Sequence, residues 1–429
     1  MGNARKTAAV ALTRVDENNA YSNIVLNDAL KKAELSKEDT ALASALFYGT
    51  LDRKITVDYY LSKFIKTPLK KIPPFSLAVL RSAVYQIKFM TRIPQSAAVN
   101  EAVKLVKNSK ENRMSGLTNA VLRNIIRNDI KLPDGSGLNS LSVRYSCPEW
   151  IVKSFIDDYG ADTAESLLAE SLETPPVTFR VNTLKTTAEE LKSELEKNGI
   201  AADFGKTENS LVIKGGTDIT KLNAYKKGLF HVQDEASQRA IAVLAPKSGE
   251  RMLDMCAAPG GKSFTAAQLM QNRGEIVACD IYNGRVGLIT EGAERLGIDI
   301  IKPRVCDAEI NYPMLGLYDC VLCDVPCSGL GVLRRKPDIK YKPCEDFSSL
   351  KKIQRTILKN ALTYLKPGGR LLYSTCTLRT DENEKLVNSV IMEYNGVKKT
   401  YEHTYMPHID KTDGFYCALI LKEGNAPLD

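Results

Sequence analysis

From Lys247 onward, segments typical of strands alternate with segments typical of helices, and only short connections join them. Such alternation builds a parallel sheet that helices cover on both faces. We expect helices at 285–296, 348–365 and 381–393, and strands at 251–255, 275–280, 302–306, 318–324, 370–374 and 415–421. Residues 247–429 are therefore predicted to form one α/β domain.

The first of these strands runs into a glycine-containing turn, D-M-C-A-A-P-G-G-K-S, at residues 254–263. Glycines at a strand-to-helix turn let the backbone approach a ligand, and the helix start offers free N–H groups. The phosphate loop of an NTPase is excluded, because that motif needs a glycine five positions before Gly261, where Cys256 stands. The turn is predicted to hold a cofactor of another kind.

Acids and thiols stand where successive strands of the predicted sheet end. Asp254 ends the first strand, Asp280 the second, Cys306-Asp307 the third and Asp324 the fourth. In an open α/β sheet the ligand lies beyond the carboxyl ends of the strands, and an acid ending the second strand can hold a ribose diol. A single Asp there is more often a helix cap or a surface residue, but the series beside a glycine turn favours a binding site.

The chain before this domain divides into three parts. Residues 1–131 read as successive amphipathic helices without a strand pattern, and the Pro-, Gly- and Ser-rich stretch 132–140 reads as a linker. Residues 141–246 begin with two helices and continue with strands at 177–181 and 211–213 around a helix at 188–198. They are predicted to form a connecting part that includes a small α+β subdomain.

Positive charge is concentrated in the helical part. Residues 1–131 carry 22 Lys and Arg against 11 Asp and Glu, although the whole chain has a net charge of only +8. A solvated basic face would explain this, but an excess confined to one domain favours contact with nucleic-acid phosphates. Arg113, Arg123 and Arg127 are the candidate contacts, whereas Val99, Val103, Val121 and Leu122 are assigned to helix packing.

Cysteine usage and the apolar pattern bear on the compartment. The ten cysteines show no short-range disulfide framework, no apolar run approaches the ~20 residues that span a bilayer, and the start lacks an apolar signal core. Cys320, Cys323 and Cys327 have no nearby histidine and suit a metal poorly. We therefore expect a cytoplasmic protein without a metal or a membrane segment.

Two stretches of the helical part resemble the RNA-binding domain related to the antitermination factor NusB. They are A-A-V-N-E-A-V-K-L-V-K at 97–107 and L-T-N-A-V-L-R-N at 117–124. The resemblance implies a NusB-like all-α domain that grips RNA.

Motifs elsewhere resemble those of the RsmB/Sun family of RNA cytosine methyltransferases, over nearly the whole chain. Besides the turn at 254–263 they are D-V-P-C-S-G at 324–329, K-P-G-G-R-L-L-Y-S-T-C-T at 366–377, D-G-F-Y-C-A-L at 413–419, F-R-V-N at 179–182, V-Q-D-E-A-S-Q at 232–238 and R-R-K-P-D-I at 334–339. The resemblance implies a Rossmann-like methyltransferase domain with a mainly parallel seven-stranded sheet. With the helical first domain, it points to the branch that acts on bacterial ribosomal RNA.

This resemblance also assigns a cofactor, S-adenosylmethionine. Asp280 would bind the ribose, Asp307 would lie near the adenine, Asp324 would close the pocket, and Arg285 matches a family arginine that helix packing would explain equally well. The methionine and sugar part would rest on the turn residues Cys256, Ala257, Ala258, Pro259, Gly260, Gly261 and Lys262.

Two thiols would carry the chemistry, because carbon 5 of cytosine is a poor nucleophile until a group adds to carbon 6. By spacing alone Cys327 and Cys376 are equivalent candidates, each after a strand end. The resemblance makes Cys376 the nucleophile and gives Cys327 a part in release. Asp324 would hydrogen-bond or protonate the cytosine ring at nitrogen 3, and Lys262 could lower the pKa of a nearby thiol, though a solvated lysine is an equal alternative.

The substrate implied is a cytidine of small-subunit (16S) ribosomal RNA, free or partly assembled, and the protein is expected to act as a monomer. Cytidine in transfer RNA is one alternative. Another is a non-catalytic RNA-binding or ribosome assembly factor. The basic run at 334–342 is expected either to follow RNA phosphates or to be a solvent-exposed loop, and His403 and His408 are expected in a loop without a role.

Overall fold

The computed structural model describes residues 3–18, 22–213, 218–342 and 346–424. The chain forms two compact units, one of residues 1–173 and 333–342 and the other of residues 174–332 and 343–429. We call them the helical unit and the α/β unit. Together they confirm the predicted fold class, an all-α first part followed by a small α+β subdomain and a mainly parallel α/β domain.

Amphipathic helices build the helical unit, and in those between residues 4 and 127 the apolar positions three and four apart meet in one core. In α7, for example, Val121, Leu122 and Ile125 are buried while Arg123 and Arg127 on the opposite face are exposed. The helices are α1 (Ala4–Asn18), α2 (Ser22–Ala33), α3 (Lys37–Asp52), α4 (Lys54–Ser62), α5 (Pro74–Phe89), α6 (Gln95–Lys107), α7 (Ser115–Arg127), α8 (Leu138–Tyr145), α9 (Glu149–Tyr159) and α10 (Ala161–Glu170).

Helices α8 to α10 count with the helical unit, whereas the sequence placed residues 141–173 in the connecting part. The reason lies in contacts between α8 and α4. The Thr56 hydroxyl donates to the carbonyl of Val143 at 2.6 Å, and the amide of Ile55 donates to the Ser146 hydroxyl at 3.1 Å. The stretch at 132–137 is therefore a short connection inside one unit, and α8 already begins at Leu138.

The basic run at 334–342 is not the solvent-exposed loop that was one of the two expectations, although Lys336 within it is exposed. Its 3₁₀ turn (Pro337–Tyr341) packs into the helical unit. The Lys340 side chain is fully buried and its ammonium lies 2.7 Å from Asp52 Oδ1, while the Tyr341 hydroxyl donates to the carbonyl of Leu51 at 2.7 Å. Residues 333–342 thus belong to the helical unit, although the residues before them, up to Val332, belong to the α/β unit.

The α/β unit begins with a four-stranded antiparallel sheet in the order β2-β3-β1-β4. Its elements are β1 (Val177–Val181), α11 (Ala188–Lys197), β2 (Ala202–Phe204), β3 (Ser210–Ile213), α12 (Asn223–Lys226) and β4 (Phe230–Val232). The three-residue strands β2 and β4 are too short to show an alternating pattern, so sequence reasoning missed them. The buried Asn182 amide ties this sheet to the rest of the unit, donating to the carbonyls of Gly228 and Leu296 at 2.8 Å each.

A larger sheet follows, with its seven described strands in the order β10-β11-β9-β8-β5-β6-β7. Strands β7, β6, β5, β8 and β9 are mutually parallel, and β11 and β10 are added antiparallel. They comprise β5 (Arg251–Asp254), β6 (Glu275–Asp280), β7 (Ile301–Val305), β8 (Tyr318–Asp324), β9 (Leu365–Thr375), β10 (Val397–Tyr405) and β11 (Phe415–Lys422).

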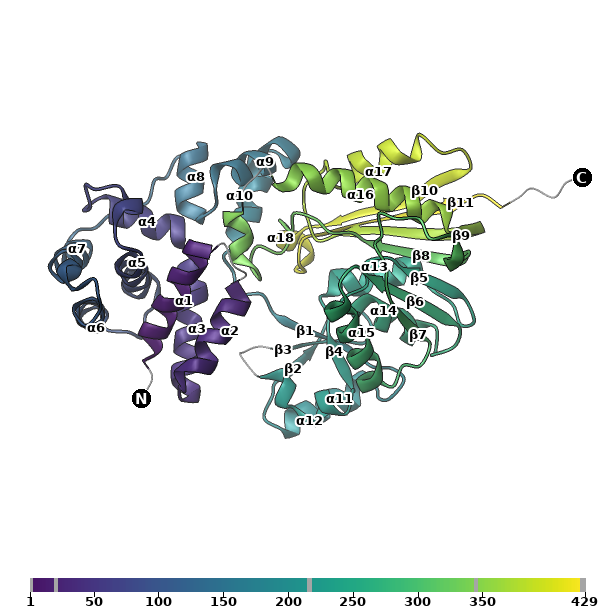
Figure 1. Cartoon of the computed structure of the whole chain (residues 1–429), viewed down its shortest axis with the longest axis horizontal. Coiled ribbons are helices and arrows are strands. Elements are labelled where there is room, and N and C mark those ends of the chain that lie inside the picture. Colours follow the sequence, from purple (N-terminus) through teal and green to yellow (C-terminus); the bar gives the residue numbers. More distant parts are fainter. Residues whose placement is uncertain (1–2, 19–21, 214–217, 343–345, 425–429) are drawn as a thin grey trace, which may run out of the picture. The chain divides into compact units, whose positions relative to one another are not determined.

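Helices cover both faces of this sheet (Figure 1). Met252 and Ile276 face the core under α13 (Glu235–Leu244), α14 (Gly261–Leu269) and α15 (Asn283–Leu296). Their neighbours Leu253 and Val277 face α16 (Asp346–Thr363) and α17 (Glu384–Ile391) on the other side. Because both faces are buried, these strands are continuously apolar, which is the pattern from which they were predicted.

Two segments near the carboxyl end differ from expectation. Residues 397–405 form the edge strand β10, which pairs His403 with Cys417, although His403 was expected in a loop. The strand is largely exposed and rich in polar residues, so it lacks an alternating apolar pattern. Helix α17 begins at Glu384 rather than 381. Of the residues before it, Glu382 accepts from the amide of Ser328 after β8, and Asn383 accepts from the hydroxyl of Thr375 at the end of β9.

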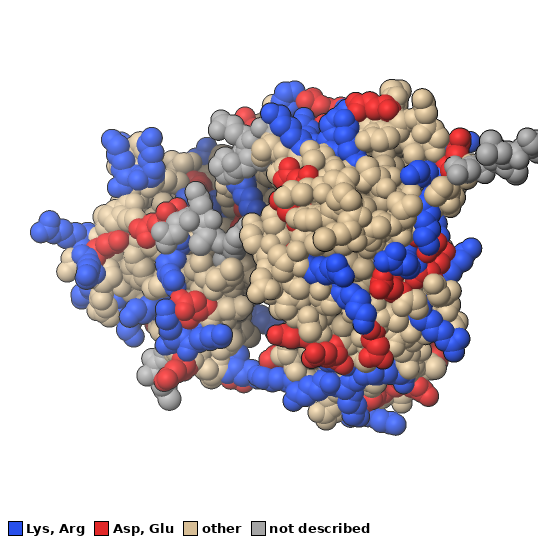
Figure 2. All heavy atoms as spheres, turned by 45° about the vertical axis from the view of Figure 1, so that its right-hand side comes forward, with Lys and Arg blue, Asp and Glu red and all other residues tan. Residues whose placement is uncertain are grey.

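Charges of both signs cover the surface of the molecule. Figure 2 shows one face on which Lys and Arg side chains are spread among Asp and Glu rather than gathered in one patch. On that face, the positive excess of residues 1–131 therefore does not form a single basic patch that would mark a binding site.

The anchor of the 3₁₀ turn predicts a stability effect. Asp52→Asn leaves the buried Lys340 ammonium without its carboxylate, and this should cost about 3 kcal/mol of folding free energy. Asp28→Asn removes a carboxylate from exposed ion pairs and should leave the thermal unfolding midpoint within the scatter of replicates. Equal midpoints for the two variants would contradict a structural role for the buried pair.

Candidate functional site

The turn between β5 and α14 has the strand–turn–helix geometry that the sequence predicted. Asp254 ends β5 and Gly261 begins α14. Gly260 has φ +107°, and a Cβ there would lie 2.3 Å from the ring of Phe264, so this position requires glycine. The Ser263 hydroxyl closes the turn by donating to Asp254 Oδ2 at 2.6 Å.

A cavity of about 210 Å³ opens beside this turn. Its lining includes Cys256, Ala257, Ala258, Pro259, Gly261 and Lys262, together with Asp254 and Asp324. Asp254 is buried, and its Oδ1 has no hydrogen-bond partner in the part of the chain that the structure describes. Burial, helped by the charge of Asp324, raises the pKa of Asp254 to about 7. A buried acceptor without a donor, next to a helix start, fits a ligand that carries both a cationic and an anionic group.

Asp280 and Arg285 lie at the neighbouring strand end, outside the residues that line this cavity. The Arg285 guanidinium is 3.2 Å from Asp280 Oδ2 and also donates to the carbonyl of Ala258 at 3.0 Å. The amide of Tyr282 donates to Asp280 Oδ1 at 3.2 Å. Arg285 therefore links Asp280, the acid that ends β6, to the glycine turn. These two specific contacts go beyond packing on the helix surface, which was the alternative explanation for this residue.

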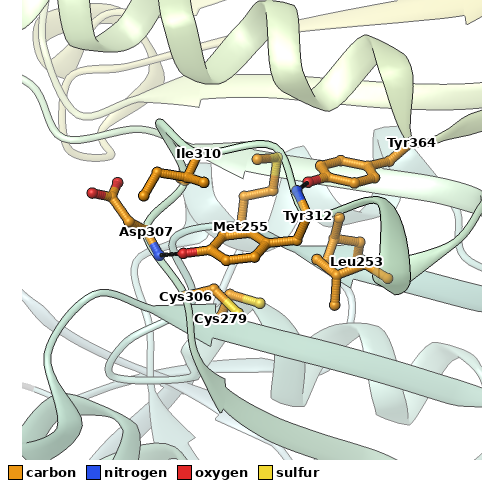
Figure 3. A pocket seen from close by; sticks show the side chains of 10 residues that line it. Leu253, Met255, Cys279, Cys306, Asp307, Ile310, Tyr312 and Tyr364 are labelled. Atoms are coloured by element: carbon orange, nitrogen blue, oxygen red, sulfur yellow. Dashed lines mark hydrogen bonds between the residues drawn. The ribbon is translucent and has the colours of Figure 1, made fainter.

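Asp307 follows β7, and two tyrosines fix its backbone (Figure 3). Its amide donates to the Tyr312 hydroxyl at 3.3 Å, and the amide of Tyr312 donates to the Tyr364 hydroxyl at 2.7 Å. The space beneath, between Cys279, Cys306 and the Tyr312 ring, is about 10 Å³, which is about the room of a single water molecule. In Figure 3 the Asp307 carboxylate points away from that space, and its Oδ1 accepts from the amide of Glu309 at 2.9 Å.

Lys262 and Asp324 form an ion pair between α14 and the end of β8. The ammonium is 2.7 Å from Asp324 Oδ2, and the Ser374 hydroxyl donates to Asp324 Oδ1 at 2.8 Å. Burial alone would lower the pKa of Lys262, but the adjacent Asp324 carboxylate and then the Cys376 thiol outweigh it and raise this pKa. Lys262 is thus a held cation and not a solvated charge.

Cys327 and Cys376 meet, with their sulfur atoms 3.3 Å apart. Cys327 follows β8 and Cys376 follows β9, which pair in parallel so that Asp324 is level with Ser374. Both thiols are partly exposed. The hydrogen bond with Cys376 and burial raise the pKa of Cys327 well above its usual value. The pair that sequence spacing singled out is therefore one site.

Sequence reasoning missed two polar residues behind this pair, Gln354 of α16 and Glu382. The fully buried Glu382 carboxylate accepts from the amide of Ser328 and from the side chain of Gln354, both at 2.9 Å. Gln354 also donates to the carbonyl of Pro326 at 2.9 Å. The sequence does show an acid, Glu382, shortly after S-T-C-T. Because a helix was expected at 381–393, this acid was expected on a helix surface.

The other described thiols lie in the interior or at its margin. Burial raises the pKa of Cys256, Cys279, Cys320 and Cys323, so these thiols resist ionisation and pack as small apolar side chains. Cys344 lies outside the described residues. Within the described ranges we find no group of three His, Cys, Asp or Glu side chains placed to hold a metal ion, and no helix there is long and apolar enough to cross a membrane.

Known proteins match this chain over nearly its whole length. Residues 241–421 match the family described as 16S rRNA methyltransferase RsmB/F, residues 2–127 match the NusB family, and residues 147–220 match the ferredoxin-like domain of RsmF/B-like methyltransferases. A probable ribosomal RNA small subunit methyltransferase B of Bacillus subtilis is 36% identical, over 98% of this chain and 99% of that protein. The ribosomal RNA small subunit methyltransferase B of Vibrio cholerae is 32% identical over 98% of each.

Solved structures show the same architecture. The crystal structure of PH0851 is 28% identical, covers 98% of this chain and 99% of its own, and superimposes with a TM-score of 0.83. A methyltransferase homologue from Pyrococcus horikoshii is 26% identical, covers 66% of this chain and 98% of its own, and has a TM-score of 0.59. The chain belongs to the RsmB/F family of 16S rRNA methyltransferases.

Proposed function

We propose that this protein transfers a methyl group from S-adenosylmethionine to carbon 5 of a cytidine in small-subunit ribosomal RNA. The observation that carries the proposal is the pair of sulfur atoms 3.3 Å apart, next to Asp324 and the cavity beside the glycine turn. The names of the relatives support ribosomal RNA as the substrate.

The residues present fit S-adenosylmethionine, which supplies an electrophilic methyl group when it is bound. The orphaned Asp254 Oδ1 would accept from its ammonium, and the N–H groups at the start of α14 would hold its carboxylate. We propose Asp280 for the ribose hydroxyls and Asp307 for the adenine edge. Arg285 would keep Asp280 in place against Ala258.

Cys376 is proposed to add as a thiolate to carbon 6 of the cytosine ring, so that carbon 5 becomes nucleophilic and accepts the methyl group. A base then removes the proton from carbon 5, the ring regains its double bond, and Cys376 leaves as a thiolate. Cys327, in contact with Cys376, would assist this release. The proximity of the Lys262 cation to Cys376 supports this assignment, because a cation stabilises a thiolate.

Asp324 is proposed to contact nitrogen 3 of the ring and offset the charge that develops when sulfur adds. Its two oxygens are fixed by Lys262 and Ser374, so the carboxylate is preorganised at the strand end. Lys262 would therefore act on both Asp324 and Cys376.

The helical unit is proposed to bind RNA through a groove between α6 and α7. The groove has a volume of about 350 Å³, with Val99 and Ile126 in its lining and Arg123 and Arg127 on its wall. No acid lines it, and within the described residues neither arginine has an ion-pair partner, although Arg123 Nε donates to Asn119 at 2.8 Å. Arg113 is exposed but does not line the groove, so we propose it only as a peripheral phosphate contact.

Two other functions predict different results. A transfer RNA methyltransferase would label transfer RNA rather than 16S RNA, and a non-catalytic assembly factor would label neither. Incubation of each RNA with methyl-labelled S-adenosylmethionine separates the three. The two adjacent thiols favour an enzyme over an assembly factor.

Cysteine variants test the covalent mechanism. Cys327→Ala should accumulate a protein–RNA adduct on a denaturing gel, because Cys376 still adds while release is slowed. Cys376→Ala should give no adduct and lose methyl transfer by at least ~10³-fold. An adduct only from Cys376→Ala would reverse the two roles, and methylation by both variants would refute the thiol mechanism.

Cofactor binding should weaken as pH falls through about 7, the pKa of the buried Asp254 carboxyl. Burial raises this pKa, so Asp254 gains its proton at a higher pH than an exposed Asp and then no longer accepts from the ligand ammonium. Between pH 8 and pH 6 the Kd of S-adenosylhomocysteine should rise roughly tenfold, measured by calorimetry. Asp254→Asn should abolish this pH dependence and Asp299→Asn, on an exposed loop, should retain it. A Kd independent of pH in the unmodified protein would contradict the role of Asp254.

The RNA groove is tested by removing its two arginines together. Arg123→Ala/Arg127→Ala should raise the KM for RNA about tenfold and reduce the slope of log Kd against log salt by about 1.4, as expected for two lost phosphate contacts on a single strand. The matched double variant Lys70→Ala/Arg92→Ala removes two exposed charges of the same unit outside the groove. Equal effects of the two double variants would point to diffuse attraction and contradict a groove.

A further inference from the structure

Opposite charges flank the pair of cysteines. On the side of Cys376 stands the Lys262 ammonium, held 2.7 Å from Asp324, whose other oxygen bonds Ser374 two residues before Cys376. On the side of Cys327 stands the Glu382 carboxylate, which accepts from the amide of the next residue, Ser328. The cation is thus linked to the strand end that carries Cys376, and the anion to the turn that carries Cys327, while the two sulfur atoms lie 3.3 Å apart.

Glu382 also fixes the turn that carries Cys327. One of its oxygens accepts from Ser328 and Gln354, and Gln354 donates at the same time to the carbonyl of Pro326. The turn is thus bonded on both sides of Cys327, at Pro326 and at Ser328. The Ser328 hydroxyl adds a 2.7 Å contact with that of Thr377, next to Cys376, which ties the two cysteine-bearing loops together.

The negative charge of Glu382 is only partly balanced by its neighbours. Glu382 is fully buried, and its Oε1 has no hydrogen-bond partner among the described residues. The nearest described cation, Arg379, has its Nε 3.7 Å from that oxygen, while its terminal nitrogen pairs with Asp381 at 2.9 Å. The Tyr373 hydroxyl donates to the backbone carbonyl of Glu382 and leaves the carboxylate untouched. A buried, incompletely paired carboxylate exerts a strong field on nearby groups.

We propose that Glu382 is a positioning residue that orients Cys327 and holds the proton on its sulfur, so that Cys327 donates a hydrogen bond to the Cys376 thiolate. The proposal rests on the thiol mechanism proposed above and adds the group that assigns the two roles. The proton that Cys376 loses passes to solvent base, and the S–H of Cys327 remains intact during the attack on carbon 6.

The direction of the pKa shift at Cys327 agrees with this arrangement. The hydrogen bond with Cys376, burial, the charge of Cys376 and then that of Glu382 raise the pKa of Cys327. Both thiols are partly exposed, so accessibility alone does not distinguish them. The electrostatic asymmetry between Lys262 and Glu382 is thus a sufficient reason for one of two touching cysteines to ionise first.

Competitive alkylation of the full-length protein without RNA tests the proposal. Limiting iodoacetamide is added between pH 6 and pH 9, and the modified peptides are quantified by mass spectrometry. Cys376 should react about tenfold or more faster than Cys327 in the unmodified protein, and its reaction should titrate at lower pH. Glu382→Gln should reduce this preference about tenfold and should shift the pH profile of Cys327 alkylation downward.

Asp381→Asn is the matched control, because it removes an adjacent carboxylate that pairs with Lys351 and Arg379 instead of facing the turn. It should keep the preference for Cys376. An unchanged preference in folded Glu382→Gln would overturn the proposal. If that variant does not fold, the unmodified protein decides the matter: equal reactivity of the two thiols, or a lower titration pH for Cys327, overturns it.

The result of the alkylation experiment can be distinguished from the results that test the proposed function. Alkylation reports the ionisation of the thiols whether or not RNA is methylated, whereas methyl transfer and the Cys327→Ala adduct report the reaction. A protein that forms the adduct but shows no effect of Glu382→Gln would retain the proposed function and refute only the role of Glu382.

Discussion

The parallel pairing of β5, β8 and β9 is the constraint on which the rest of the site depends. It sets Asp254 level with Leu322 and Asp324 level with Ser374, so the acids and thiols that end these strands reach the same edge of the sheet. Because the connections after β8 and β9 leave from adjacent strand ends, Cys327 and Cys376 are brought to 3.3 Å although 49 positions separate them in sequence. The glycine turn after β5 opens on the same edge and adds the cofactor cavity.

Electrostatics then differentiates groups that look equivalent in sequence. Two aspartates, one lysine and one glutamate are enclosed near the pair of thiols, and each is held by a named partner: Asp254 by Ser263, Asp324 by Lys262 and Ser374, and Glu382 by Ser328 and Gln354. In a poorly solvated site such charges act strongly on one another. On the proposed mechanism, the cation favours a thiolate at Cys376 and the anion favours a thiol at Cys327.

The sequence could predict those parts of the fold and of the site that patterns of neighbouring residues encode. The apolar strands and the acids that end them are local signals, so the sheet, the glycine turn and both candidate thiols were found. The burial of Lys340 was not, because a lysine in a basic run looks solvated until its partner Asp52, far away in the chain, is known. Glu382 was missed because residues 381–383 lie outside α17, although their sequence favours a helix. Strand β10 was missed because an exposed edge strand carries no alternation of apolar and polar residues.

The most direct test of the central claim is to identify the protein atom that attaches to the base. RNA that contains 5-fluorocytidine at the target position keeps fluorine on carbon 5 after methyl transfer, so the final proton removal cannot occur and the adduct persists. The proposed mechanism predicts that proteolysis of this trapped complex yields a peptide in which Cys376 carries the methylated nucleotide. Attachment at Cys327, or the absence of any adduct when the same protein methylates unmodified RNA, would contradict it.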